Sequence, residues 1–314
     1  MKKRLFDIFR LLRPRQWLKN LAIFAAATFT GGLFDGAILQ KTLLGFIIFC
    51  GVSSAIYIIN DIFDIEKDRM HPFKKFRPLA TRDVSIVTAL FLSFFLIFFS
   101  LFFSPLVAPA FLVLIIIYLF LQLSYSLFLK NIAVLDIIIL AAGYILRVYG
   151  GEVATGFHIS VWLLLTTISL SLFLAVGKRR SELTLISDFT GEQIKKTRKS
   201  LSHYSERLLD VYASIFATST FISYALFTFL ENPVGFKLSL GVLMPDFLPS
   251  FFQRKWLMLT IIPVVYGLMR YMQDIYEKHE GESPEKVLLS DKPLLFTVLL
   301  WTFMVIIIIY FIGP

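Results

Sequence analysis

An acidic stretch at residues 60–68, which reads NDIFDIEKD, directly follows a long apolar run. Asp61, Asp64 and Asp68 are spaced at i, i+3 and i+7, so on a helix they share one face, and Asn60 joins Asp64 at i+4. Carboxylates crowded on one face repel each other unless a cation is present. Oxygen ligands favour Mg²⁺, Ca²⁺ or Mn²⁺, and Mg²⁺ usually completes its shell with water and substrate phosphates. The spacing therefore predicts a Mg²⁺–diphosphate site, with Mn²⁺ as an alternative ion.

Basic side chains follow these carboxylates after a few positions. They are Arg69, His71, Lys74, Lys75 and Arg77. Pro72 and Pro78 prevent a continuous helix here, and a segment with both charges can hold a metal and the anion that the metal bridges. The alternative is a solvated loop whose charges only set topology, and we assign Lys67 and Arg82 to it. The aspartates fit that alternative poorly, because acidic residues contribute little to topology.

Long apolar stretches must position these groups. The chain has 314 residues, of which 57% are hydrophobic and 17% charged, whereas a soluble domain is about a quarter charged. A membrane helix needs about 20 largely apolar residues. We predict nine spans, at 18–34, 42–59, 84–104, 108–129, 132–149, 159–176, 208–230, 256–272 and 294–312. The predicted fold is an all-α integral membrane bundle, with residues 1–314 forming a single catalytic domain.

The distribution of Lys and Arg orients these spans. With a cytosolic N-terminus, the segments predicted to be cytosolic hold almost all of the 31 basic residues. The exceptions are Lys41, Arg147, Lys237, Arg254 and Lys255. The positive-inside rule then predicts a multi-pass protein of the cell membrane with its C-terminus outside. Residues 60–83 and 177–207 become cytosolic active-site loops.

The N-terminal residues 1–17 alternate apolar and basic side chains. This pattern fits an interfacial amphipathic helix, or a positive topology signal alone. A cleaved signal peptide is not expected, because charge extends to Lys19 and further spans follow. Arg13, Gln16, Lys19 and Asn20 begin the first span, where they can bind a lipid phosphate or anchor the chain at the interface.

Polar residues also flank or enter the fifth span. Tyr125 and Lys130 precede it and fit either a site or ordinary interfacial anchoring. Asp136 lies inside it, and intramembrane charges are costly and usually face a cavity or a partner. We predict that Asp136 belongs to the site or to a structural polar network. Arg147, near the far end of the span, is expected to make a structural pair or to reach the interface.

Several segments together make a family recognisable. The run NDIFDIEKDRMHPFKKFRPLA at 60–80 resembles the first aspartate-rich motif of the UbiA superfamily of intramembrane prenyltransferases. Its HPFKKFRPLA tail is similar to the decaprenyl-phosphate phosphoribosyltransferase branch. Further similar segments are LLRPRQWLKN at 11–20, YSLFLKN at 125–131, LDIIILAAGYILRVYGG at 135–151, GKRRSEL at 177–183 and GESPEKVLLSDKPL at 281–294. The first of these favours a functional role for Gln16, Lys19 and Asn20.

The segment after the sixth predicted span departs from the wider superfamily. Most UbiA relatives carry a second aspartate-rich motif there, which binds a second Mg²⁺, whereas this chain has GKRRSEL. Three cations suit additional phosphates, such as a ribose 5-phosphate or a lipid monophosphate. Positive-inside topology accounts for one or two of them. We assign Lys178, Arg179 and Glu182 to substrate binding and leave Arg180 undecided.

The resemblance implies transfer of a 5-phosphoribosyl group from phosphoribosyl diphosphate to a decaprenyl-type polyprenyl phosphate, with release of diphosphate. In that reaction Asp61, Asp64 and Asp68 would hold Mg²⁺, and Asn60 would orient a ligand or bind the sugar. The remaining candidate substrate-binding residues are Lys19, Asn20, Lys74, Lys75, Arg77, Tyr125, Lys130, Asp136, Lys178, Arg179 and Glu182. Catalysis would then rest on positioning and electrostatic stabilisation.

Two other functions remain in competition. A UbiA-type prenyltransferase would move an isoprenyl group from a prenyl diphosphate to an aromatic or lipid acceptor, and it predicts a second carboxylate-rich motif. A transporter predicts ionisable residues through the middle of several spans, whereas here only Asp136 and Arg147 lie within spans. A homo-oligomer is an open alternative to a monomer.

Several function classes receive no support from the sequence. Because the charges are explained by topology, no nucleic-acid partner is expected. The four His residues lack metal-ligand spacing, and the single Cys50 lies in an apolar run. Neither a P-loop nor a GxSxG motif is present.

Overall fold

The computed structural model describes residues 2–70, 74–185, 199–231, 256–277 and 284–312, and all its regular elements are helical. In the first half these are α1 Lys2–Leu11, η1 Pro14–Ile23, α2 Phe24–Phe29, α3 Gly36–Phe63, α4 Ile65–Met70, η2 Lys74–Phe76, α5 Ile86–Val107, α6 Pro109–Leu127 and η3 Leu129–Asn131. In the second half they are α7 Leu135–Thr155, α8 Val161–Leu185, η4 Lys199–His203, α10 Glu206–Leu230, η6 Trp256–Thr260, α12 Ile261–Glu277, α13 Pro284–Ser290, α14 Lys292–Ile307 and the π-helical η7 Ile308–Ile312.

Seven of these helices are long and apolar enough to cross a membrane. They are α3, α5, α6, α7, α8, α10 and, taken with the start of η7, α14. The all-α integral membrane fold is therefore confirmed. The other two predicted spans, 18–34 and 256–272, correspond to the broken helices η1–α2 and η6–α12. Nine crossings and a cytosolic N-terminus stay predictions.

The predicted end of the sixth span at residue 176 is wrong, because α8 continues to Leu185. GKRRSEL therefore forms the last turns of a helix and does not belong to a loop. Arg179 and Arg180 in this stretch have partners on neighbouring helices, so their charges do not force the helix to end at residue 176. Within the predicted loop 177–207, residues 186–198 lie outside the described residues.

The bundle shows which helices face lipid. On α5, Phe94, Phe98 and Phe102 form a ladder at i, i+4 spacing, with ring centroids 6.4 and 6.1 Å apart, and all three are exposed. Only 17% of the α5 span is buried, against 61% of α3. Helix α3 is thus a central element that can carry a site, while α5 presents aromatic side chains to the membrane.

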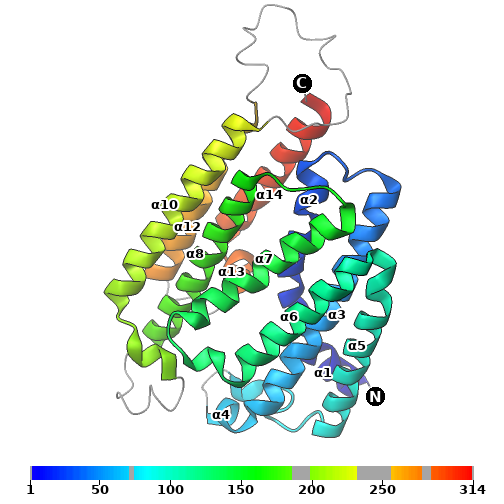
Figure 1. Ribbon diagram of the computed structural model, residues 1–314. Coiled ribbons are helices and arrows are strands. Elements are labelled where there is room, and N and C mark those ends of the chain that lie inside the picture. Colours follow the sequence, from blue (N-terminus) through cyan, green and yellow to red (C-terminus); the bar gives the residue numbers. More distant parts are fainter. Residues whose placement is uncertain (1, 71–73, 186–198, 232–255, 278–283, 313–314) are drawn as a thin grey trace, which may run out of the picture.

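A single glycine brings the N-terminal segment against the middle of the bundle. A Cβ on Gly151 of α7 would lie 2.1 Å from the carbonyl oxygen of Ile23 in η1, so any larger residue would force the two segments apart. This close approach sets Lys19 and Asn20 of η1 beside Tyr144 and Arg147 of α7. Figure 1 shows α4, the end of α8 and the start of α10 at one end of the bundle, opposite to the end of α14.

Candidate active site

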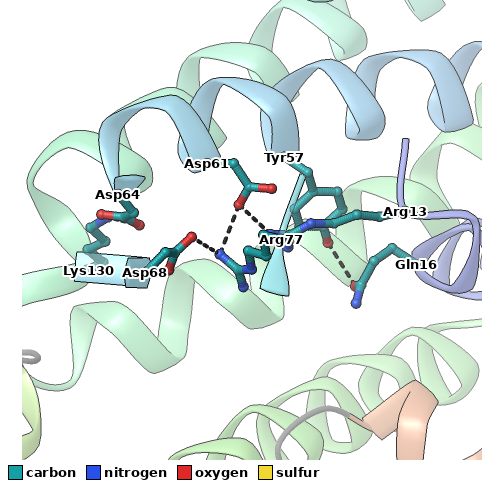
Figure 2. Close-up of polar contacts among 8 residues, drawn as sticks. All are labelled: Arg13, Gln16, Tyr57, Asp61, Asp64, Asp68, Arg77 and Lys130. Carbon is teal, nitrogen blue, oxygen red and sulfur yellow. Dashed lines mark hydrogen bonds and ion pairs between the residues drawn. The ribbon is translucent and has the colours of Figure 1, made fainter. Parts of the chain in front are cut away.

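Asp61, in the last turn of α3, lies at the centre of a charged cluster. Its Oδ1 accepts hydrogen bonds from Arg13 Nη2 and from Arg77 Nη1, the latter at 2.9 Å. The same Arg77 Nη1 donates to Asp68 Oδ2 at 2.6 Å (Figure 2). The Asp61 and Asp68 side chains are both buried. Two carboxylates from α3 and α4 therefore converge on one guanidinium nitrogen.

The turn before η1 aims Arg13 at this cluster. Arg13 adopts a left-handed conformation with φ 54°, which is uncommon for a non-glycine residue. Pro14 follows it, and a residue before proline is disfavoured in the α region. Helix α1 accordingly ends at Leu11, short of the predicted 1–17. The resulting bend places the Arg13 guanidinium beside Asp61 and 5.1 Å above the Tyr57 ring.

Asp64 does not join the other two aspartates. It is the C-terminal cap of α3, and both of its carboxylate oxygens accept hydrogen bonds from Lys130 Nζ at 3.0 Å. Lys130 comes from η3, on the side away from Arg77, as Figure 2 shows. Asp64 leaves the shared face because α3 ends at Phe63 and because Lys130 of a neighbouring segment binds its carboxylate. Within the described residues, no group of three His, Cys, Asp or Glu side chains could hold a metal.

The Asp61–Asp68 pair nevertheless fits a divalent cation. Because both carboxylates bond a single Arg77 nitrogen, both can reach one point in space. Mg²⁺ commonly uses one or two carboxylates and takes its other ligands from water and phosphates. Burial raises the pKa of the Asp68 carboxyl above its ordinary value, and the charge of Asp61 adds to the rise while Arg77 opposes it. Two buried carboxylates this close are stabilised by a shared cation.

The remaining candidate residues of the 60–83 segment differ in how close they lie to the carboxylate pair. Asn60 is half-buried, one position before Asp61, and Lys74 lies near enough to Asp68 to act on its charge. Lys75 is exposed, with its ammonium 5.2 Å above the Phe76 ring. His71 lies outside the described residues. Lys74 thus stays close to the carboxylate pair, whereas Lys75 points away from it.

A second charged cluster surrounds Arg179 of α8, whose side chain is fully buried. Its Nε lies 2.8 Å from Asp136 Oδ2, its Nη1 donates to Glu182, and its Nη2 donates to the Tyr125 hydroxyl at 2.7 Å. Asp136 also accepts from Tyr204 Oη at 2.7 Å and from Ser200 Oγ at 3.0 Å. The structure brings these predicted residues together in a network that joins α6, α7 and α8. The two terminal nitrogens of Arg179 donate hydrogen bonds to Glu182 and Tyr125, and its Nε is ion-paired with Asp136.

Lys178 differs from its neighbours in the same turn. Within the described part of the chain it makes no hydrogen bond or ion pair, and its side chain is partly exposed. Its charge acts on Glu182 and on Glu285. Arg180 instead faces α10, where it pairs with Glu206 and Asp210. Of the three consecutive cations, Lys178 is therefore the one available to a ligand.

Lys19 and Asn20 of η1 have side chains that lie inside the bundle. Lys19 Nζ lies 3.0 Å from Glu285 Oε2 and donates to Gln16 Oε1 at 2.7 Å. Asn20 is fully buried, and its Oδ1 accepts from Arg147 Nε at 2.7 Å. The Asn20 side chain is thus hydrogen-bonded to Arg147. This is the structural pair that was expected for Arg147. Lys19 lies at the boundary between this interior network and the charged end of the bundle.

Glu285 was missed as a site residue, although it lies in the GESPEKVLLSDKPL segment. It is buried on the short helix α13, and its Oε1 accepts from Gln16 Nε2. Burial raises the pKa of its carboxyl, but the nearby Lys19 ammonium outweighs burial, so that the pKa lies below its ordinary value. The overlooked signal is the position of Glu285 in a segment shared with one branch of a family.

Comparisons with known proteins identify the family of this chain. The UbiA prenyltransferase family profile matches residues 21–301. The chain belongs to the UbiA family. Members of this family are prenyltransferases, so the chain is an integral membrane transferase. A UbiA homologue from Archaeoglobus fulgidus, determined with DMAPP and Mg²⁺, shares the fold at a TM-score of 0.68 and 20% identity, over 95% of this chain and 98% of that one.

Two curated relatives are more similar in sequence, and both are named decaprenyl-phosphate phosphoribosyltransferase. The protein from Corynebacterium glutamicum is 34% identical over 96% of this chain and 86% of its own length. The protein from Mycolicibacterium smegmatis is 35% identical over 94% of this chain and 89% of its own length. Identity at this level along most of the chain confirms the branch resemblance in the motifs.

Proposed function

We propose that this UbiA-family protein transfers a 5-phosphoribosyl group from phosphoribosyl diphosphate to a polyprenyl phosphate and releases diphosphate. The observation that carries the proposal is the replacement of a second carboxylate motif by Gly177–Lys178–Arg179. Arg179 is held by Asp136 and Glu182, and Lys178 is left available to an anion. One carboxylate pair and a cationic partner suit a sugar diphosphate that meets a lipid monophosphate. The names of the curated relatives support the same reaction.

In this proposal Asp61 and Asp68, which both reach Arg77 Nη1, would hold Mg²⁺. When bound, the metal neutralises the charge that develops on the leaving diphosphate. Arg77 and Arg13 then turn from the carboxylates to the diphosphate oxygens, which suit a guanidinium equally well. Asp64 stays a candidate third ligand, although it needs to leave Lys130 to reach the metal. Mn²⁺ is expected to substitute for Mg²⁺, because both accept oxygen ligands.

The lipid phosphate is the nucleophile. It is already ionised near neutral pH, so the reaction needs no strong general base. Lys178 and Lys19 would bind phosphate groups at the membrane end of the site, and Lys74 would bind them at the solvent end. The anomeric carbon gains positive charge as the diphosphate leaves, and the phosphate oxygen attacks it. Positioning and electrostatic stabilisation supply the rate enhancement.

The location of each substrate follows from the same proposal. The polyprenyl tail stays in the bilayer while its phosphate reaches the charged end of the bundle. Phosphoribosyl diphosphate is soluble and enters from the cytosol, which requires that this end face the cytosol. We place the protein in the cell membrane, with residues 1–314 acting as one catalytic domain.

The test is an assay with purified protein and labelled phosphoribosyl diphosphate, across polyprenyl phosphates of different length, with and without Mg²⁺. The proposal predicts a labelled lipid product that requires both the lipid and the metal. A labelled prenyl diphosphate, offered with aromatic and lipid acceptors, is the matched alternative donor. Transfer from the prenyl diphosphate alone would contradict the proposal and favour the prenyltransferase reaction. Uptake of the donor into proteoliposomes without chemical change would instead indicate transport.

A further inference from the structure

Glu285 is tied to the metal-binding end of the bundle by an unbroken series of contacts. It bonds Gln16, and Gln16 Oε1 accepts from the Tyr57 hydroxyl at 3.1 Å. The Tyr57 ring lies under the guanidinium of Arg13, which bonds Asp61. Helix α13, from the C-terminal half of the chain, thus carries a buried carboxylate that is linked to Asp61 through Gln16, Tyr57 and Arg13.

The other polar group of interest near Glu285 is the hydroxyl of Tyr271 on α12. This hydroxyl is buried, with the residue only 4% exposed, and it makes no hydrogen bond within the described residues. It lies against α8, because a Cβ on Gly177 would be 3.1 Å from the hydroxyl oxygen. Gly177 directly precedes Lys178. Glu285 and Tyr144 are electrostatic neighbours of the Tyr271 hydroxyl.

Other buried tyrosines show that this is unusual for the protein. Their hydroxyls all have hydrogen-bond partners: Tyr118 with Arg147, Tyr204 with Asp136, Tyr224 with Thr260, and Tyr310 with Ala27. A buried hydroxyl without a partner loses its hydration and gains nothing in return. Such a group calls for an explanation, and a ligand that supplies the missing hydrogen bond is one.

We propose that Glu285 and Tyr271 bind hydroxyl groups of the pentosyl donor, and that they select a sugar with both ring hydroxyls over a deoxy sugar. This inference rests on the proposed function. A carboxylate offers about four lone-pair sites, and Gln16, Lys19 and a backbone N–H use three of those on Glu285. The remaining site can accept from a sugar hydroxyl, while the Tyr271 hydroxyl can donate or accept. A prenyl group has no hydroxyls and would leave both residues unsatisfied.

The alternative is a structural role in which Glu285 only positions Lys19. The two roles differ in how the loss depends on the donor. If Glu285 binds a hydroxyl, its substitution harms the full donor and spares a donor that lacks that hydroxyl. If Glu285 only positions Lys19, a phosphate-binding group, substitution harms every donor by the same factor.

The experiment measures kcat/KM for phosphoribosyl diphosphate and for its 2-deoxy and 3-deoxy analogues. The enzymes are the wild type, Glu285→Gln and Tyr271→Phe. We expect the wild type to prefer the full donor over at least one analogue by about 10- to 100-fold, the discrimination typical of one hydrogen bond to a charged group. In each variant that preference should fall about tenfold, through loss of activity with the full donor. The preference is the ratio of two kcat/KM values measured on the same preparation. A fraction of unfolded protein lowers both values equally and does not change the ratio.

Two matched controls make the same chemical changes elsewhere. Asp291→Asn removes a carboxylate that caps α14 and pairs with Arg270, and Tyr310→Phe removes a hydroxyl bonded to Ala27 and Leu33. Both should keep the wild-type preference. Equal loss with all donors in Glu285→Gln and Tyr271→Phe would overturn the inference and leave the proposed function intact. A wild type that transfers no phosphoribosyl group would overturn both.

Discussion

The clusters around Asp61 and around Arg179 contain the same residue types but differ in how they are satisfied. Arg179 is fully buried and divides its nitrogens among Asp136, Glu182 and Tyr125. Arg77 is about a quarter exposed, at 23%, and a single nitrogen of it serves both Asp61 and Asp68. A buried cation that is already paired with two carboxylates offers no free charge to a ligand. A cluster in which two carboxylates share one accessible cation can exchange that cation for a metal and turn it to a phosphate.

The largest expected effect is at the Asp61 cluster. Asp61→Asn removes one charge from the carboxylate pair, and loss of one electrostatic contact to a transition state costs about 10²- to 10³-fold in kcat. We expect a loss of that size with an unchanged thermal unfolding midpoint in detergent. The measurement is transfer of labelled phosphoribosyl groups beside a melting curve. An Asp61→Asn enzyme with near-normal turnover would refute the metal assignment.

The next effect belongs to the Arg179 network and should appear in stability. Arg179→Met leaves Asp136 buried without its cation, and breaking a buried pair costs about 3–5 kcal/mol. We expect a markedly lower unfolding midpoint and poor yield, with activity falling in proportion to folded protein. Arg180→Met, which changes the neighbouring and more exposed cation, is the control and should unfold near the wild-type midpoint. A stable Arg179→Met protein without activity would place Arg179 in substrate binding instead.

A smaller effect is expected at Asp64, which the structure separates from the carboxylate pair. Asp64→Asn should lower kcat less than Asp61→Asn does, by about tenfold, because Lys130 holds this carboxylate away from Arg77. Lys130→Gln, which frees Asp64, should cost at most about 1 kcal/mol of stability because the pair is partly exposed. The comparison uses kcat at saturating Mg²⁺. Equal losses for Asp61→Asn and Asp64→Asn would show that all three carboxylates act together, as the spacing alone suggests.

The smallest effect is a pH dependence of stability at Glu285. Lys19 holds the pKa of this carboxyl below its ordinary value of about 4.5, so the folded state binds its proton less readily than the unfolded state. The stabilisation is therefore complete above pH 4.5 and is lost as the pH falls through the lower, folded-state value. Glu285→Gln should be less stable than the wild type at neutral pH, and the gap should shrink in acid. A gap that is constant with pH would refute the ion pair as its cause.

The sequence predicted the helical fold and the family, because apolar length, charge distribution and motifs are local features. It failed where distant helices decide the outcome. Lys130 draws Asp64 aside, and partners on α6 and α7 let α8 continue past residue 176. Glu285 lay in a family-like segment without standing out there, and Tyr271 had no sequence signal, because burial and a missing hydrogen bond are not revealed by spacing in the chain.

The most direct measurement is the rate of phosphoribosyl transfer to a polyprenyl phosphate as Mg²⁺ is titrated from full chelation to excess, in the wild type and in Asp68→Asn. We predict no product under chelation, recovery with Mg²⁺ or Mn²⁺ in the wild type, and a higher half-saturating metal concentration in Asp68→Asn. Transfer at the full rate under chelation, or identical metal curves for the two proteins, would contradict a metal held between Asp61 and Asp68.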